Sequence, residues 1–213
     1  MSKKLNGCSL ILPFIVGIVL GVAAKLVDVP FITADLPIFD DIMGRFGIWV
    51  WAGALTAVLS RTSLLAAVRS FAFFAGMLIA YYSYTVLFLH FFPKSQMILW
   101  GGIAMATPFC GYLMWHVHKK KYYANFIASL PFIIFFTEWY LTAFQNQYWS
   151  AGDKVWLLVA YLCMTFSLLL AVPTNKKRLL GVFYGSVISI ILICLIQAGI
   201  MFNLYEKLLN VSF

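Results

Sequence analysis

The chain has 213 residues, of which 63% are hydrophobic, 18% aromatic and only 10% charged, and its mean hydropathy is +0.94. A water-soluble domain contains roughly 45–50% apolar and about 25% charged residues. This composition therefore excludes a water-soluble globular protein. We therefore predict an all-α integral membrane protein with a single transmembrane domain over residues 1–213. The net charge is +8, but no extramembrane part is large enough to read nucleic acid, so no nucleic-acid partner is expected.

Seven apolar runs, bounded by charged or turn residues, predict a bundle of about seven transmembrane helices. The predicted spans are residues 10–26, 46–59, 70–92, 97–115, 124–143, 155–172 and 179–202. A helix needs about 20 residues to cross a hydrocarbon core of roughly 30 Å. The second run is therefore short, and it must recruit residues from Asp41 onward, tilt, or be partly re-entrant. Between the first two runs, residues 27–45 alternate acids and prolines with apolar residues, which predicts a segment lying on the membrane surface.

The lysines and arginines predict the orientation of this bundle. With seven spans, ten of the 15 basic residues share the face of the N-terminus and five lie on the other face. By the positive-inside rule, the N-terminus is cytoplasmic and the C-terminus external. Two clusters on the inner face are candidates for contact with anionic lipid head groups, and the favoured alternative is that they only anchor the orientation. These residues are Lys119, Lys120, Lys121, Lys176, Lys177 and Arg178.

The sequence contains no motif that would support catalysis or a cofactor. It has no HExxH, no G-x-S-x-G and no glycine-rich phosphate loop, so we expect neither an enzyme nor a bound cofactor. His116 and His118 are the nearest approach to a metal-ligand pair. On a helix their side chains point about 200° apart, and the three lysines that follow would repel a cation. No metal site is therefore expected.

Glu138 is the one acid inside an apolar run. An ionisable side chain at membrane depth is expensive and is a functional candidate by default. The alternative is a carboxylate near the head groups or an ordinary hydrogen bond between helices. His90 and Gln197 come at a similar outer depth on their own runs, so the three groups would line an outward pocket if they converge. The hypothetical substrate-binding residues are Glu138, His90, Gln197, Ser83 and Trp49, with Trp51, Tyr81 and Tyr84 around them.

Pairs of small residues four apart permit two helices to approach closely. Three such pairs occur, namely Gly17 with Gly21, Gly102 with Ala106, and Gly181 with Gly185. They predict either packing within one subunit or a homo-oligomer.

Four segments carry a resemblance to a known family, and they are Phe46–Trp51, Leu59–Thr62, Phe73–Tyr82 and Leu99–Ala104. In these positions the chain resembles a family of small multispanning membrane proteins of clostridium-like Gram-positive bacteria. The resemblance implies a bacterial plasma membrane. It brings no activity and no catalytic residue.

Two functions fit these patterns. The first is transport or binding of a small solute through the outward pocket. The second is a non-transporting membrane partner or immunity-type protein that acts through helix–helix contacts. The expected partners are the lipid bilayer, a small solute, and either a second copy of the chain or a membrane partner subunit.

Overall fold

The computed structural model describes residues 8–27, 42–145, 150–173 and 175–198. Over these residues the chain is entirely helical, with seven α-helices and one short 3-10 helix and no strand. The elements are α1 (Cys8–Val27), α4 (Phe46–Val58), α5 (Ser63–Leu89), α6 (Lys94–Trp115), η1 (His116–His118), α7 (Tyr123–Gln145), α8 (Ala151–Ala171) and α9 (Asn175–Gln197).

Five of these helices, α5 to α9, are long and apolar enough to cross a membrane. This confirms the prediction of an all-α chain with membrane-spanning helices. The two remaining apolar helices, α1 and α4, are shorter. The 13 residues of α4 give a length of about 20 Å, less than the thickness of the hydrocarbon core. Most of the predicted surface segment, residues 28–41, and the end of the last predicted span, residues 199–202, lie outside the described residues.

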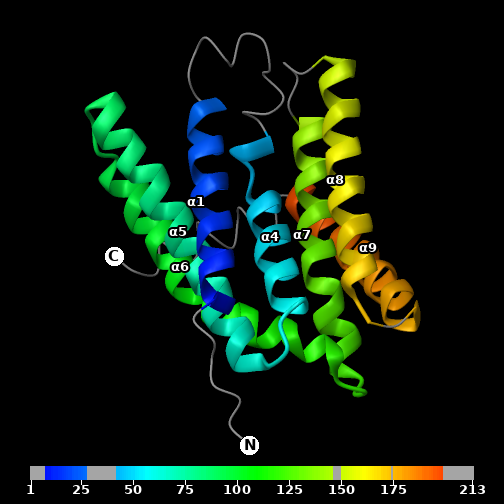
Figure 1. Ribbon diagram of the computed structural model, residues 1–213. Helices are drawn as coiled ribbons and strands as arrows, with labels where there is room; N and C mark the ends of the chain where they lie inside the picture. The colour runs from blue at the N-terminus through cyan, green and yellow to red at the C-terminus, as the bar shows by residue number, and fades with distance from the viewer. Residues whose placement is uncertain (1–7, 28–41, 146–149, 174, 199–213) are drawn as a thin grey trace, which may run out of the picture.

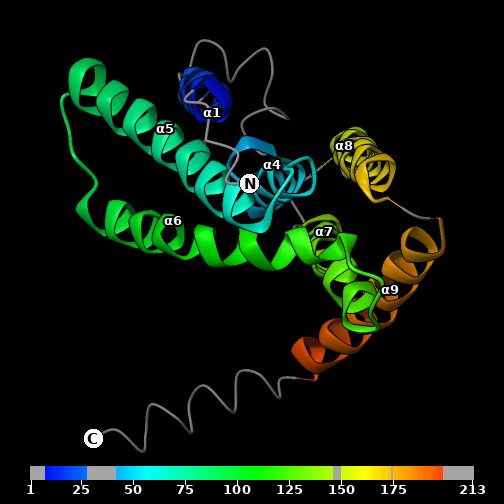
Figure 2. The ribbon, with the colours of Figure 1, turned by 60° about the horizontal axis from the view of Figure 1, so that its bottom comes forward.

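Helix α4 occupies the centre of the molecule. Figure 1 and Figure 2 show α1, α5 and α6 on one side of it and α7, α8 and α9 on the other. α4 packs against α5, α6, α7 and α8, and it contributes to two separate apolar clusters. Trp49 and Ala52 pack with Phe73 of α5, whereas Ala57 packs with Phe132 of α7. The short helix therefore links two groups of longer helices.

Glycine allows close helix–helix contact at two of the long interfaces. A Cβ atom on Gly17 of α1 would overlap the carbonyl oxygen of Phe73 on α5, and a Cβ atom on Gly21 would lie 2.5 Å from the carbonyl oxygen of Met77. On α9, a Cβ atom at Gly185 would lie 2.7 Å from the Cβ of Phe132. The first and third of the predicted small-residue pairs thus serve packing within the subunit, because no larger side chain fits there.

The ends of the helices follow local caps rather than charges. α5 begins at Ser63, seven residues before the predicted span, because the Thr62 side chain accepts a hydrogen bond from the backbone N–H of Leu65. It ends at Leu89 because His90 adopts a left-handed conformation with φ of 54°. α8 begins with a capping box in which Ser150 and Asp153 bond each other's backbone N–H groups.

Candidate functional site

The carboxylate of Glu138 on α7 caps the N-terminus of α4. Its Oε1 accepts a hydrogen bond of 2.8 Å from the backbone N–H of Phe46, and its Oε2 accepts one of 2.6 Å from Gly47. The first N–H groups of a helix have no partner within the helix, and the helix dipole makes that end positive. The N-cap residue Arg45 supplies no side-chain cap. Glu138 therefore satisfies α4 from another helix, 92 residues away along the chain.

Two residues that the sequence did not single out complete this junction. The Tyr161 hydroxyl of α8 donates a hydrogen bond of 2.7 Å to Oε2 of Glu138. A Cβ atom on Gly47 would lie 2.6 Å from the same oxygen and 2.9 Å from the Tyr161 hydroxyl, so the carboxylate fits only because residue 47 is glycine. The sequence held one signal for this junction. It was a short apolar run preceded by arginine, which cannot cap a helix N-terminus with its side chain, together with one acid at membrane depth. The structure gives Glu138 the helix–helix hydrogen bonds that were the alternative to a pocket.

The other predicted polar residues lie elsewhere. His90 ends α5 and is exposed, and Ser83 is exposed on the same helix. α5 leans away from α7 and α9 toward its C-terminal end (Figure 1). Gln197 donates a hydrogen bond of 2.9 Å from its Nε2 to the Tyr140 hydroxyl on α7. The structure thus places His90 and Ser83 on α5, Glu138 on α7 and Gln197 on α9, and none of the four lines the cavity that the described residues form.

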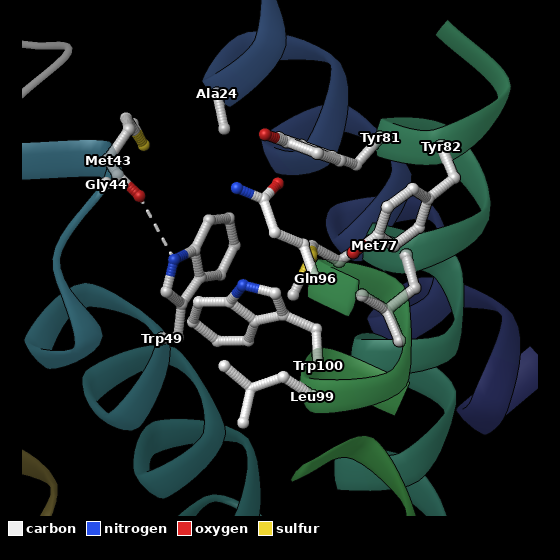
Figure 3. A pocket seen from close by; sticks show the side chains of 11 residues that line it. Ala24, Met43, Gly44, Trp49, Met77, Tyr81, Tyr82, Gln96, Leu99 and Trp100 are labelled. Atoms are coloured by element: carbon white, nitrogen blue, oxygen red, sulfur yellow. Dashed lines mark hydrogen bonds between the residues drawn. The ribbon is translucent and has the colours of Figure 1, made fainter. Parts of the chain in front are cut away.

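Trp49, by contrast, lines a cavity of about 340 Å³ between α1, α4, α5 and α6 (Figure 3). Its lining residues are Ala24, Met43, Gly44, Trp49, Met77, Leu78, Tyr81, Tyr82, Gln96, Leu99 and Trp100. Tyr81 was expected beside Trp49, and it does line this cavity. Trp51 and Tyr84 do not, since the Trp51 indole donates to the Ser167 hydroxyl of α8 at 2.8 Å and Tyr84 packs against Phe88.

Hydrogen bonds fix part of the cavity wall. The indole N–H of Trp49 donates to the carbonyl oxygen of Met43 at 3.1 Å, which fixes the plane of a tryptophan only 4% exposed. Behind the wall, the buried Lys25 of α1 donates from Nζ to the Tyr81 hydroxyl at 3.3 Å, and Nζ lies 4.8 Å from the centre of the Tyr81 ring. The Gln96 amide projects into the cavity toward Trp49 and Tyr81 (Figure 3).

The basic residues proposed to face lipid divide into two groups. Lys177 is only 8% exposed, and its Nζ donates to the carbonyl oxygens of Val117 and Lys119. Arg178 donates from Nε to Val172 and from Nη2 to Leu170, at the C-terminal end of α8. These two cations satisfy backbone carbonyls at helix ends. Lys177 is thereby buried against the protein, whereas Arg178 is half-buried, and its contact with lipid head groups stays a prediction.

The other four basic residues of this set are exposed. The Lys119 ammonium lies 5.0 Å from the centre of the Trp115 ring and that of Lys121 lies 5.8 Å from the Tyr123 ring, while Lys120 and Lys176 are exposed. A contact with head groups stays a prediction for these four.

No family model, no curated protein and no solved structure matches this chain. Among the described residues, no group of three or more His, Cys, Asp and Glu side chains is placed to hold a metal ion. Any function must therefore be argued from the geometry of the chain itself, and its most distinctive feature is the aromatic cavity.

Proposed function

We propose that this chain is a multi-pass membrane protein that binds a small solute in the cavity between α1, α4, α5 and α6. The observation that carries the proposal is the cavity itself, with a volume of about 340 Å³. Small-molecule sites start at about 300 Å³. Aromatic and thioether side chains with a few polar groups line it, which is the usual composition of such sites.

The predicted orientation supports binding from outside the cell. In the seven-span arrangement with a cytoplasmic N-terminus, α1 and α5 end at the outer face and α6 begins there. The cavity is lined by Ala24 near the end of α1, by Tyr81 and Tyr82 in the second half of α5, and by Gln96 near the start of α6. Binding of a solute from outside the cell is what an uptake protein or a receptor subunit does. The location of this chain in a bacterial plasma membrane is part of the proposal.

Glu138 enters this function as a positioning residue. It binds the backbone of Phe46 and Gly47, which lie between Gly44 and Trp49 in the cavity wall. The carboxylate thus holds the start of α4 where its first turn forms one side of the cavity. The solute itself does not need to touch Glu138, His90 or Gln197.

Filling the cavity tests the proposal. Leu99 lines the cavity and is 62% exposed, whereas its neighbour Ile98 is 76% exposed and does not line it, so Leu99→Trp and Ile98→Trp are matched variants. The full chain in nanodiscs would be screened by thermal shift against small aromatic and aliphatic compounds. We expect at least one compound class to raise the Tm of wild type and of Ile98→Trp but not of Leu99→Trp. If no compound distinguishes the two variants, the cavity is not a solute site.

The second function, a non-transporting membrane partner, is supported by one feature of α6. A Cβ atom on Gly102 would meet no atom within 4 Å, and Ala106 is exposed one turn later. Of the three small-residue pairs, this one has no helix packed against it within the described residues. Chemical cross-linking of the wild type and Gly102→Leu in nanodiscs would test it. A wild-type dimer that Gly102→Leu abolishes would favour this function, and a monomer in both cases would contradict it.

A further inference from the structure

The Tyr82 hydroxyl is a buried polar group without a partner in the cavity wall. Tyr82 is 7% exposed, and its hydroxyl oxygen has no hydrogen bond. The ring is held by edge contact with Tyr81, with centroids 5.3 Å apart, and by Phe92 at 5.9 Å. Figure 3 shows the hydroxyl directed toward Gln96 and Met77 inside the cavity. Buried polar groups nearly always find partners. Of the four buried side-chain atoms without a partner in the described residues, the Tyr82 hydroxyl is the one that lines the cavity, so it is available to a ligand there.

The polar groups of the cavity are mainly donors. Beside the Tyr82 hydroxyl stand the Trp100 indole N–H and the Gln96 side-chain amide. An indole nitrogen can only donate, whereas the amide carries two donor hydrogens and one acceptor oxygen, and a tyrosine hydroxyl can donate or accept. The thioethers of Met43 and Met77 are weak acceptors. The Lys25 cation beside Tyr81 further disfavours a cationic ligand. A complementary ligand therefore carries oxygen acceptors.

The walls of the cavity are flat and fixed. Trp49 is oriented by its hydrogen bond to the Met43 carbonyl oxygen, and the Trp100 ring contacts Phe46 with centroids 6.2 Å apart. Aromatic rings pair best in offset stacks or edge contacts, and thioethers make favourable contacts with aromatic rings. Such walls favour a planar conjugated ligand over an aliphatic chain.

We infer that the ligand is a planar conjugated ring bearing carbonyl oxygens, of the quinone class, with the Tyr82 hydroxyl donating a hydrogen bond to one of these oxygens. The inference rests on the proposed function and names the solute class for the same cavity. An aliphatic solute would leave the Tyr82 hydroxyl unpaired, and a cation would meet Lys25.

Two compounds of the same outline separate the ring from its oxygens. They are 2,3-dimethyl-1,4-naphthoquinone and 2,3-dimethylnaphthalene, and the methyl groups hinder addition of exposed thiols such as Cys110 to the quinone. Dissociation constants would be measured by calorimetry on the full chain in nanodiscs, with empty nanodiscs as the control for partition into lipid. The variants are Tyr82→Phe and, as a matched control, Tyr84→Phe, since Tyr84 does not line the cavity.

We expect wild type to bind the quinone about tenfold more tightly than the hydrocarbon, as one net hydrogen bond provides. Tyr82→Phe should remove this difference in affinity by weakening the binding of the quinone, and it should leave the binding of the hydrocarbon unchanged. It should also leave the Tm of the free protein unchanged or raise it, because removal of this hydroxyl breaks no hydrogen bond of the free protein. Tyr84→Phe should bind both compounds as wild type does.

The outcomes separate this inference from the proposed function. Equal binding of both compounds, or a Tyr82→Phe variant that still prefers the quinone, overturns the carbonyl-ring class and leaves solute binding in place. The class is also overturned if neither compound binds while others from the panel do so in a way that Leu99→Trp blocks. If no compound of any class binds the cavity, both proposals fail.

Discussion

The α1–α5 interface and the junction of α4 with α7 and α8 join helices by opposite means. In the first, Gly17 and Gly21 place one backbone directly against another, and the hydrogen bond from Lys25 to the Tyr81 hydroxyl lies near the end of the same interface. In the second, one carboxylate links three helices through hydrogen bonds to Phe46, Gly47 and Tyr161. Lipid tails are as apolar as leucine, so helices in a membrane associate through close packing or hydrogen bonds rather than hydrophobic transfer. This chain uses both solutions, and the close approach of Gly185 to Phe132 shows that glycine packing also occurs on the α7 side of the central helix.

Different kinds of substitution should therefore disrupt the two regions. A close backbone contact is lost when any volume is added, because the opposing atoms are backbone and cannot rotate away. A hydrogen-bonded junction is lost when charge or acceptors are removed, even at constant volume. Substitutions can therefore separate the two mechanisms.

The largest effect is expected from Gly17→Leu. The new Cβ would overlap the Phe73 carbonyl oxygen, so α1 must move away from α5, at a cost of about 3 kcal/mol of unfolding free energy. Gly102→Leu is the matched control, because a Cβ there meets no atom within 4 Å. Reversible unfolding in mixed micelles measures both. Equal stability of the two variants would show that α1 and α5 are not in backbone contact.

A smaller loss is expected from Glu138→Leu. The change leaves the N–H groups of Phe46 and Gly47 without acceptors at the start of α4, and costs about 2 kcal/mol. Glu138→Gln keeps one acceptor oxygen but sets its amide N–H₂ against a donor, so it should cost about half as much. The same unfolding assay gives both values. Wild-type stability of Glu138→Leu would mean that the carboxylate does not hold α4.

The smallest of the three effects is expected from Tyr161→Phe, at about 1 kcal/mol, because it removes one hydrogen bond and keeps the buried ring. Tyr184→Phe, at an exposed position on α9, should be neutral. A double-mutant cycle with Glu138→Gln should show non-additive losses, since both changes affect one hydrogen-bonded group. Additive losses would place the Tyr161 hydroxyl outside the junction.

The helix boundaries show why apolar runs predicted the elements better than their ends. Arg69 marked the edge of the third run, yet α5 continues through it to the cap at Thr62. Charges indicate where a helix leaves the hydrocarbon, whereas hydrogen bonds to the terminal backbone groups decide where it stops. His90 was expected inside the predicted span 70–92, and its left-handed backbone instead ends the helix.

In the candidate site too, the sequence indicated some of the residues but not the contacts that they make. Trp49 and Tyr81 were predicted to surround a pocket formed by Glu138, His90 and Gln197. They line a different cavity, which contains none of those three residues. Tyr82 and Gln96 were not predicted to line a cavity, because nothing in their local sequence shows that α5 and α6 diverge there around an open space. Lys177 was assigned to lipid, and its partners are backbone carbonyls 58 and 60 residues away.

The sequence by itself determined that this chain is helical and built from membrane-length apolar segments. That result follows from composition and run length, because each helix satisfies its own backbone hydrogen bonds in lipid. Only the tertiary structure decided that Glu138 caps α4, and that residues of four helices line one cavity. These features depend on backbone groups and helix crossings far apart along the chain, and backbone N–H groups are the same in every sequence, so no residue pattern marks the one that a distant carboxylate will bind.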